Sequence, residues 1–273
     1  MIVFPNCKIN LGLHILGKRT DGYHNIETVF YPLPFFDVLE VIQSSNTDQL
    51  YELFLSGNTI EGEPENNLCV KAYFLLKKDF PQLPAVKIYL HKVIPSGAGL
   101  GGGSANGAFM LMLLNRKFNL NISAQQLLQY ALSLGSDCPF FIINKPCFAQ
   151  QRGEFLTPLK IDLSAYKIVL INPGIHVNTG WAFTQVTLSN PNNINTAIVK
   201  PVNEWKACLT NDFELPVFEK YPEIKNIKNA LYLSGALYAS MSGSGSTMFG
   251  IFPKQTVINT EIFPSHYFIK ELI

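Results

Sequence analysis

The clearest periodic stretch of the chain is CKINLGLHI at residues 7–15, where apolar and polar residues alternate without interruption. The apolar positions are Cys7, Ile9, Leu11, Leu13 and Ile15, and the polar ones are Lys8, Asn10, Gly12 and His14. A period of two predicts a β-strand. Lys8 and Asn10 are then neighbours on one face, about 7 Å apart. Asp-Gly at 21–22 predicts a turn after this strand.

The same reasoning predicts the other elements. Strands are expected at 26–33, 36–42, 86–93 and 167–173, and on both sides of a Gly/Ser turn at 242–246. Helices are expected at 65–80 behind an Asn cap, at 104–118, at 121–135 with a Ser123–Gln126 capping box, after 176, and at 222–235. SDCPFFII (136–143) is interpreted as a turn leading into a buried strand, and SNPNNINTA (189–197) as a loop. Because strands and helices interleave without regular β-α-β alternation, we predict an α+β fold, with a second block beginning near residue 155.

Composition narrows the class of protein without defining it. Among 273 residues, 47% are hydrophobic and 15% charged, and the formal net charge is +1. This balance argues against binding nucleic acid by phosphate neutralisation alone, and no like-charge run suggests a membrane surface. Five dispersed cysteines without paired spacing indicate reduced thiols, neither disulfides nor a zinc site. With no signal peptide evident, we expect a cytoplasmic protein without a nucleic-acid or membrane partner.

Five of the ten residues in PSGAGLGGGS (95–104) are glycine. A flexible linker is excluded because apolar elements enter and leave this stretch. A dinucleotide fold needs an acidic residue about 20 positions on, but none occurs between Asp79 and Asp137. A Walker loop needs Lys followed by Ser or Thr after the last glycine, and this is absent. Two interpretations stay open: an anion site at the N-terminus of the next helix, or a crowded turn that permits close packing.

The segment PSGAGLGGGSA resembles the phosphate loop of the kinase superfamily named for galactokinase, homoserine kinase, mevalonate kinase and phosphomevalonate kinase (GHMP kinases). Segments at 8–30, 135–142 and 242–252 resemble the branch that phosphorylates 4-diphosphocytidyl-2-C-methyl-D-erythritol in the non-mevalonate isoprenoid pathway, and NDFE at 211–214 also fits. The resemblance implies two α+β domains with the active site in the cleft between them. The ATP-binding domain would be 1–154, and the substrate-binding domain 155–273.

The resemblance also implies the reaction, transfer of the γ-phosphoryl group of ATP to the 2-hydroxyl of the methylerythritol moiety. Lys8 and Asp137 match the catalytic pair of the family. Asp137 would take the hydroxyl proton, and Lys8 would keep Asp137 ionised and offset charge on the moving group. These roles suit a loose transition state that needs positioning and neutralisation. Taken alone, Asp137 would serve turn chemistry and Lys8 would be a surface lysine on a solvated strand face.

ATP is the cofactor that the resemblance implies, together with Mg²⁺. The implied ATP-binding residues are Asn67, Lys92, Pro95, Ser96, Gly97, Ala98, Gly99, Leu100, Gly101, Gly102, Gly103, Ser104 and Ala105. Many relatives have Ser-Ser-Asp where this chain has Ser104-Ala105-Asn106. The loss of that carboxylate leaves the protein ligands of the metal unidentified, and we expect ATP oxygens and water to hold it.

For the cytidine end, Tyr23 and Phe183 match positions that stack on the base, and His24 matches one that hydrogen-bonds its edge. Asn10 and Thr179 are further implied substrate-binding residues. The alternatives are a core role for Phe183 and turn capping for His24. The turn at 242–246 would bring backbone amides to the substrate diphosphate, or be an ordinary hairpin turn. The other four histidines are expected to be structural.

Two rival functions follow from the same residues. One is a superfamily kinase acting on mevalonate or homoserine, which would not need the aromatic positions. The other is a nucleotide-binding regulator without catalysis. The presence of both Lys8 and Asp137 argues against this function. The sequence leaves the oligomeric state open.

Overall fold

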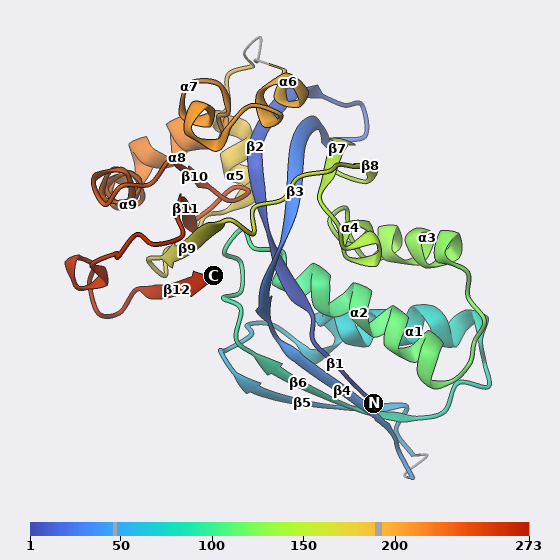
Figure 1. Ribbon diagram of the computed structural model, residues 1–273. Coiled ribbons are helices and arrows are strands. Elements are labelled where there is room, and N and C mark those ends of the chain that lie inside the picture. The colour runs from blue at the N-terminus through green and yellow to red at the C-terminus, as the bar shows by residue number, and fades with distance from the viewer. Residues whose placement is uncertain (46–47, 189–192, 273) are drawn as a thin grey trace. The chain divides into compact units, whose positions relative to one another are not determined.

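The computed structural model describes residues 1–45, 48–188 and 193–272 and confirms the predicted α+β class (Figure 1). The strands are β1 (Ile2–Val3), β2 (Asn6–Lys18), β3 (His24–Phe36), β4 (Val38–Gln43), β5 (Tyr51–Gly57), β6 (Val86–Lys92), β7 (Cys147–Gln151), β8 (Phe155–Pro158), β9 (Tyr166–Asn172), β10 (Tyr238–Met241), β11 (Met248–Pro253) and β12 (Phe268–Leu272). The helices are α1 (Leu68–Asp79), α2 (Gly102–Lys117), α3 (Ala124–Leu134), α4 (Cys138–Ile143), α5 (Thr179–Gln185), α6 (Ile194–Ile198), α7 (Trp205–Cys208), α8 (Glu214–Lys220) and α9 (Pro222–Leu233). Short 3₁₀ turns lie at Pro64–Asn66, Val202–Glu204 and Thr260–Ile262.

The chain divides into two compact units that alternate along the sequence. Unit 1 consists of Met1–Cys7, Pro34–Ser96 and Gly101–Lys145, and unit 2 of Lys8–Leu33, Gly97–Leu100 and Pro146–Ile273. These units differ from the continuous segments 1–154 and 155–273 that the sequence suggested. The physical reason is that β2 is bonded to residues far along the chain: the amide of Leu13 donates to the carbonyl of Thr210, and the amide of Ile15 donates to the carboxylate of Asp212.

Unit 1 is built on a mixed sheet in the order β1-β4-β6-β5, in which only the β5–β6 pair is parallel. Alternate residues of β6 face the core, namely Val86, Ile88, Leu90 and Lys92. Helices α1 and α2 pack against each other beside this sheet (Figure 1). The cap of α1 by Asn67 and the capping box of α3 are confirmed as predicted.

Residues 138–143 form helix α4, so the prediction of a buried strand there was wrong. A short apolar run of this length has no period that separates a strand from a buried helix. Pro139 in the first turn favours the helix, because its fixed φ suits that position and its missing N–H is not needed there. Asp137 therefore lies at the N-terminal end of a helix rather than before a strand.

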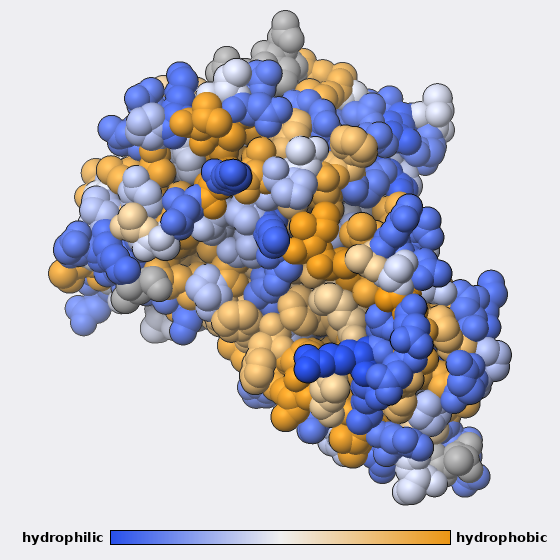
Figure 2. Space-filling view, turned by 45° about the vertical axis from the view of Figure 1, so that its right-hand side comes forward, coloured by the Kyte–Doolittle hydropathy of each residue, from blue (hydrophilic) through white to orange (hydrophobic). Residues whose placement is uncertain are grey.

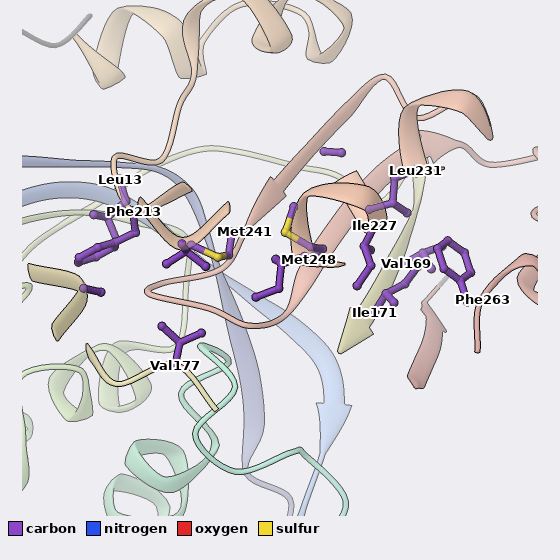
Figure 3. Close-up of a cluster of buried hydrophobic side chains, with 14 of the residues drawn as sticks. Leu13, Val169, Ile171, Val177, Phe213, Ile227, Leu231, Met241, Met248 and Phe263 are labelled. Atoms are coloured by element: carbon purple, nitrogen blue, oxygen red, sulfur yellow. The ribbon is translucent and has the colours of Figure 1, made fainter. Parts of the chain in front are cut away.

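Unit 2 contains two antiparallel sheets, ordered β2-β3-β7-β8 and β10-β11-β9-β12. A hydrophobic cluster joins strand β2 to the second sheet and to α8 and α9 (Figure 3). In Figure 3, Leu13 and Phe213 lie at one end of this cluster, Met241 and Met248 in its middle, and Phe263 at the other end. The predicted strand–turn–strand around residues 242–246 is confirmed, with β10 and β11 paired in antiparallel register.

Part of the Asn-rich segment 189–197 is helical. Residues 194–198 form α6, with Asn193 accepting a hydrogen bond from the amide of Asn195, so the loop prediction was wrong there. Asn is a preferred N-cap, which explains how this polar stretch begins a helix. The remaining residues, 189–192, lie outside the described part of the chain.

Apolar side chains also reach the surface, and the face in Figure 2 shows hydrophobic areas between hydrophilic ones. Within the ranges that the structure covers, no helix combines the length and hydrophobicity needed to cross a bilayer.

Candidate functional site

The glycine loop connects β6 to α2, and its backbone repeatedly enters the left-handed region. Gly97, Gly99 and Gly101 have φ values of 64°, 79° and 70°. Such values strain residues that carry a Cβ, so glycine is required by conformation alone. Gly101 occupies the N-cap position of α2. The first amides of an α-helix have no partner within the helix, and they concentrate positive potential at this end of the loop.

Different glycines of the loop are needed for different reasons. A Cβ on Gly99 would lie 1.9 Å from the carbonyl oxygen of Ser242, and one on Gly102 would lie 2.9 Å from Cγ2 of Ile94. A Cβ on Gly103 would meet no described atom within 4 Å. Close packing therefore accounts for Gly99 and Gly102. Close packing against described atoms does not explain the glycine at position 103. An anion site at the start of α2 therefore stays open as the interpretation there.

Lys8 is buried, with 3% of its surface exposed, so the idea of a lysine on a solvated strand face was wrong. Its ammonium donates hydrogen bonds to Oδ1 of Asn10 at 2.6 Å and to the carbonyl oxygen of Gly99 at 3.0 Å. Its Nζ atom also lies 5.1 Å from the centroid of the Phe30 ring. The backbone of β2 reaches the same loop, because the amide of Lys8 donates to the carbonyl of Leu100. The buried ammonium of Lys8 is thus held against the part of the glycine loop that contains Gly99 and Leu100.

Asn10 orients this lysine and links it to the Gly/Ser turn at 242–246. Its Nδ2 donates to Oγ1 of Thr28 at 3.0 Å, which leaves Oδ1 free to accept from Lys8. The hydroxyl of Ser242 donates to the carbonyl of Gly99 at 2.8 Å. Sequence reasoning gave the side chains of this turn no part, yet Ser242 holds the turn against the loop. The signal available in the sequence was a serine at the start of a glycine-rich turn.

Asp137 precedes α4 in unit 1, and its carboxylate does not cap that helix. The next residue, Cys138, is buried and interacts with the side chain of Ser104, near the start of α2. Burial raises the pKa of the Cys138 thiol to about 12, so it stays protonated at neutral pH. Helices α2 and α4 contact each other. Asp137 therefore lies next to a residue that contacts the end of the glycine loop, and its catalytic role stays a prediction. Lys8 belongs to the other unit, and its pairing with Asp137 stays a prediction.

Asn67 and Lys92, both expected beside adenine, have structural partners. Oδ1 of Asn67 accepts from the amide of Cys69 and caps α1. Lys92 is buried on the core face of β6, where its ammonium pairs with Asp37 and donates to Oδ1 of Asn106 at 3.0 Å. A role of either residue toward ATP stays a prediction.

The residues expected to hold a base lie in unit 2. Tyr23 is 53% exposed, and the guanidinium carbon of Arg152 lies 4.7 Å from its ring centroid. The rings of His24 and Phe183 stack at 4.5 Å with an interplanar angle of 10°, and Phe183 also contacts the core residue Phe213 edge-on. Burial lowers the pKa of His24, and the Lys18 ammonium lowers it further, so this imidazole is neutral near pH 7.

Thr179 comes close to the Gly/Ser turn, since its hydroxyl and that of Ser244 lie 2.8 Å apart. The motif NDFE (211–214), which the sequence analysis noted only as a family match, also holds the turn at 242–246. Nδ2 of Asn211 donates to the carbonyls of Met241 and Gly243, at 2.8 Å each. Asp212 bonds His14 and the amide of Ile15 in β2. No local pattern predicts these contacts, because each joins residues far apart in the sequence.

Comparison with known proteins identifies the class first. Residues 67–145 match the family model of the GHMP kinases N terminal domain, and residues 197–260 match that of the GHMP kinases C terminal. A solved mevalonate kinase from Methanococcus jannaschii shares the fold, with a TM-score of 0.69 at 12% identity over 99% of this chain and 97% of that chain. The two family models thus define the chain as a kinase of the ATP-dependent GHMP type.

More similar relatives define the branch. A 4-diphosphocytidyl-2-C-methyl-D-erythritol kinase from Bacteroides fragilis is 52% identical over the whole of both chains. One from Azobacteroides pseudotrichonymphae is 48% identical over 98% of this chain and all of the relative. A crystal structure of 4-(cytidine 5'-diphospho)-2C-methyl-D-erythritol kinase superimposes with a TM-score of 0.79 at 30% identity, over 92% of this chain and 90% of that chain. The chain belongs to the 4-diphosphocytidyl-2-C-methyl-D-erythritol kinase family of the GHMP kinases, which confirms the resemblance seen in the sequence.

Proposed function

We propose that this kinase transfers the γ-phosphoryl group of ATP to the 2-hydroxyl of 4-diphosphocytidyl-2-C-methyl-D-erythritol. The observation that carries the proposal is 52% identity over the full length to a relative of that name. The conformation of the glycine loop and the buried lysine beneath it support the same chemistry. Mevalonate and homoserine kinases share the fold at identities of 12–15%, which supports the fold alone.

In the proposed mechanism, the amides at the start of α2 bind ATP phosphates and neutralise their charge. Asp137 orients the acceptor hydroxyl and takes its proton. Lys8 offsets the charge of the moving phosphoryl group, and its position is fixed by Asn10 and Gly99. Phosphoryl transfer demands mainly such positioning and electrostatic stabilisation, so the reaction does not require a strong base.

Mg²⁺ would neutralise phosphate charge when it enters with ATP. Among the described residues, no group of three or more His, Cys, Asp or Glu could hold a metal ion. Asn106, which replaces the carboxylate of many relatives, directs both polar side-chain atoms to Asp37 and Lys92. We therefore propose that ATP oxygens and water hold most of the metal shell, with the Ser104 hydroxyl as the candidate protein ligand.

At the other end of the substrate, we propose that the cytosine ring stacks on Tyr23 and Phe183, and that neutral His24 hydrogen-bonds its edge. Base–aromatic stacking contributes about 1–3 kcal/mol per base. His24 covers one face of Phe183, so a base that stacks on this face would displace the imidazole. Asn10, Thr179 and the amides of the 242–246 turn would contact the rest of the substrate. Cytoplasmic location and the lack of membrane or nucleic-acid partners stay predictions.

The test is an ADP-release assay with the cytidine-linked alcohol, mevalonate and homoserine as acceptors. We expect turnover with the first alone. In the same assay Asp137→Asn should lower kcat on the order of 10³-fold while ATP affinity is kept. Preferred turnover of mevalonate or homoserine would refute the proposed acceptor. Near-normal turnover by Asp137→Asn would remove Asp137 from its role.

A further inference from the structure

Asp37, between β3 and β4, is completely buried and fully hydrogen-bonded. Its Oδ1 accepts from the backbone amides of Val93 at 2.8 Å and Ile94 at 2.9 Å. Its Oδ2 accepts from Nδ2 of Asn106 at 2.9 Å and from the ammonium of Lys92. A buried carboxylate is tolerated only with such complete pairing. We call Asp37, Lys92 and Asn106 the Asp37 cluster.

The partners of Asp37 flank the glycine loop on both sides. Lys92, Val93 and Ile94 directly precede Pro95, and Asn106 lies in α2 two residues after Ser104. Packing at the start of α2 is equally tight, because a Cβ on Gly102 would lie 3.2 Å from Nζ of Lys92. One carboxylate therefore holds the strand that enters the loop and the helix that leaves it.

The charges of the Asp37 cluster balance only with an amide at position 106. The cluster contains one carboxylate and one ammonium, and Asn106 bridges them, donating to Asp37 and accepting from Lys92. A second carboxylate at position 106 would leave an uncompensated negative charge in a dry interior, which is strongly unfavourable. Asn106 is thus the neutral member of a buried network, and its identity follows from the presence of Asp37.

We propose that Asp37 is a positioning residue for ATP, which it does not contact itself. By fixing the segments before and after the loop, it holds the amides of the first turn of α2 in the arrangement that accepts phosphates. A loop without this anchor would have to be ordered by ATP on binding, at a cost in affinity. The inference rests on the proposed function of the loop, and it predicts an effect on ATP affinity rather than on the acceptor.

The test uses Asp37→Asn, Asn106→Asp and the double variant that exchanges the two side chains. In the double variant, the amide at position 37 accepts from the amides of Val93 and Ile94 through its oxygen. Its NH₂ group donates to the carboxylate at position 106, which also accepts from Lys92. The double variant therefore keeps one carboxylate in the cluster. It also keeps the hydrogen bond between positions 37 and 106, with position 37 now donating and position 106 accepting.

The readout is the dissociation constant of ATP, measured calorimetrically with Mg²⁺ present, beside the acceptor KM and the melting temperature. We expect each single change to weaken ATP binding at least tenfold and to shift the acceptor KM less than twofold. The double variant should recover most of the lost ATP affinity. Leu114→Ala is the matched control, because it truncates a fully buried side chain that lies eight residues after Asn106 along α2.

The results separate the possible failures. A double variant that does not regain ATP affinity, folded or not, overturns the positioning role. The role is equally overturned if Leu114→Ala weakens ATP binding as much as a single change, since destabilisation alone would then explain the loss. If the unaltered chain itself fails to bind ATP, the proposed function fails instead. Rescue by the exchange, with the acceptor KM unmoved, supports the proposal.

Discussion

Replacing single glycines of the loop tests which of them serve packing and which serve the nucleotide. Gly99→Ala places a methyl group 1.9 Å from the Ser242 carbonyl oxygen at a backbone φ of 79°. The left-handed conformation costs a residue with a Cβ about 1–2 kcal/mol. Forcing the Ser242 carbonyl away adds about 1–3 kcal/mol. The sum of about 2–5 kcal/mol corresponds to a fall in Tm of about 4–20 °C, taking 2–4 °C per kcal/mol for a chain of this size.

Gly103→Ala is the matched control in the same loop. The new methyl group meets no described atom within 4 Å, and alanine favours a helix over glycine by up to about 1 kcal/mol. Tm should therefore stay constant or rise. If the first turn of α2 receives ATP phosphates, the methyl group obstructs them. We expect ATP affinity to fall at least about tenfold, which is 1.4 kcal/mol.

Differential scanning calorimetry and ATP titration of both variants distinguish a packing role from a role in binding ATP. The expected pattern is a large Tm loss for Gly99→Ala, and an affinity loss without a Tm loss for Gly103→Ala. Unchanged ATP affinity in Gly103→Ala would refute phosphate binding at this helix terminus. A stable Gly99→Ala variant would show that the Ser242 carbonyl is not held against the loop.

Three further changes test other parts of the site. Asn211→Ala removes the Nδ2 group that donates to the carbonyls of Met241 and Gly243. We expect the free energy of unfolding, measured with denaturant, to fall by about 1–3 kcal/mol and kcat to fall as well. An unchanged kcat would show that the turn plays no part in catalysis. Tyr23→Ala should raise KM for the cytidine-linked substrate about 5-fold to 150-fold, because about 1–3 kcal/mol of stacking energy is lost. KM for ATP should not change. An unchanged KM for the cytidine-linked substrate would exclude stacking on Tyr23. The pKa of His24 is depressed below its ordinary 6.5, so the stability it contributes is present above pH 6.5 and lost as pH falls through the lower folded-state value. An NMR titration should show this midpoint below 6.5 and moving upward in Lys18→Gln; a midpoint at or above 6.5 would contradict it.

Local signals predicted the elements whose determinants lie within a few residues. Strand β2 follows from an unbroken period of two, and α3 from a capping box and a glycine stop that act inside one turn. The apolar run after Asp137 failed as a guide because six residues carry too little periodicity, and the proline in the first turn was the better signal.

The burial of the polar face of β2 could not be inferred from its own residues. Its partners come from distant parts of the chain: Gly99 beside Lys8, Ser242 beside Asn10, and Asp212 beside His14. Lys92 did carry a local signal, since it continues the apolar alternation of β6 and so falls on the buried face. A lysine in that position requires a buried acid, and only the structure identifies Asp37 as that acid.

The alternation of the two units along the chain has a consequence for synthesis on the ribosome. The hairpin of β2 and β3 is complete at residue 36, but β7, which pairs with β3, begins only at residue 147. At about 5–20 residues per second, the hairpin waits roughly 6–22 s for its partner. During that interval the edge of β3 that β7 later occupies remains unpaired, the kind of edge that chaperones shield in nascent chains.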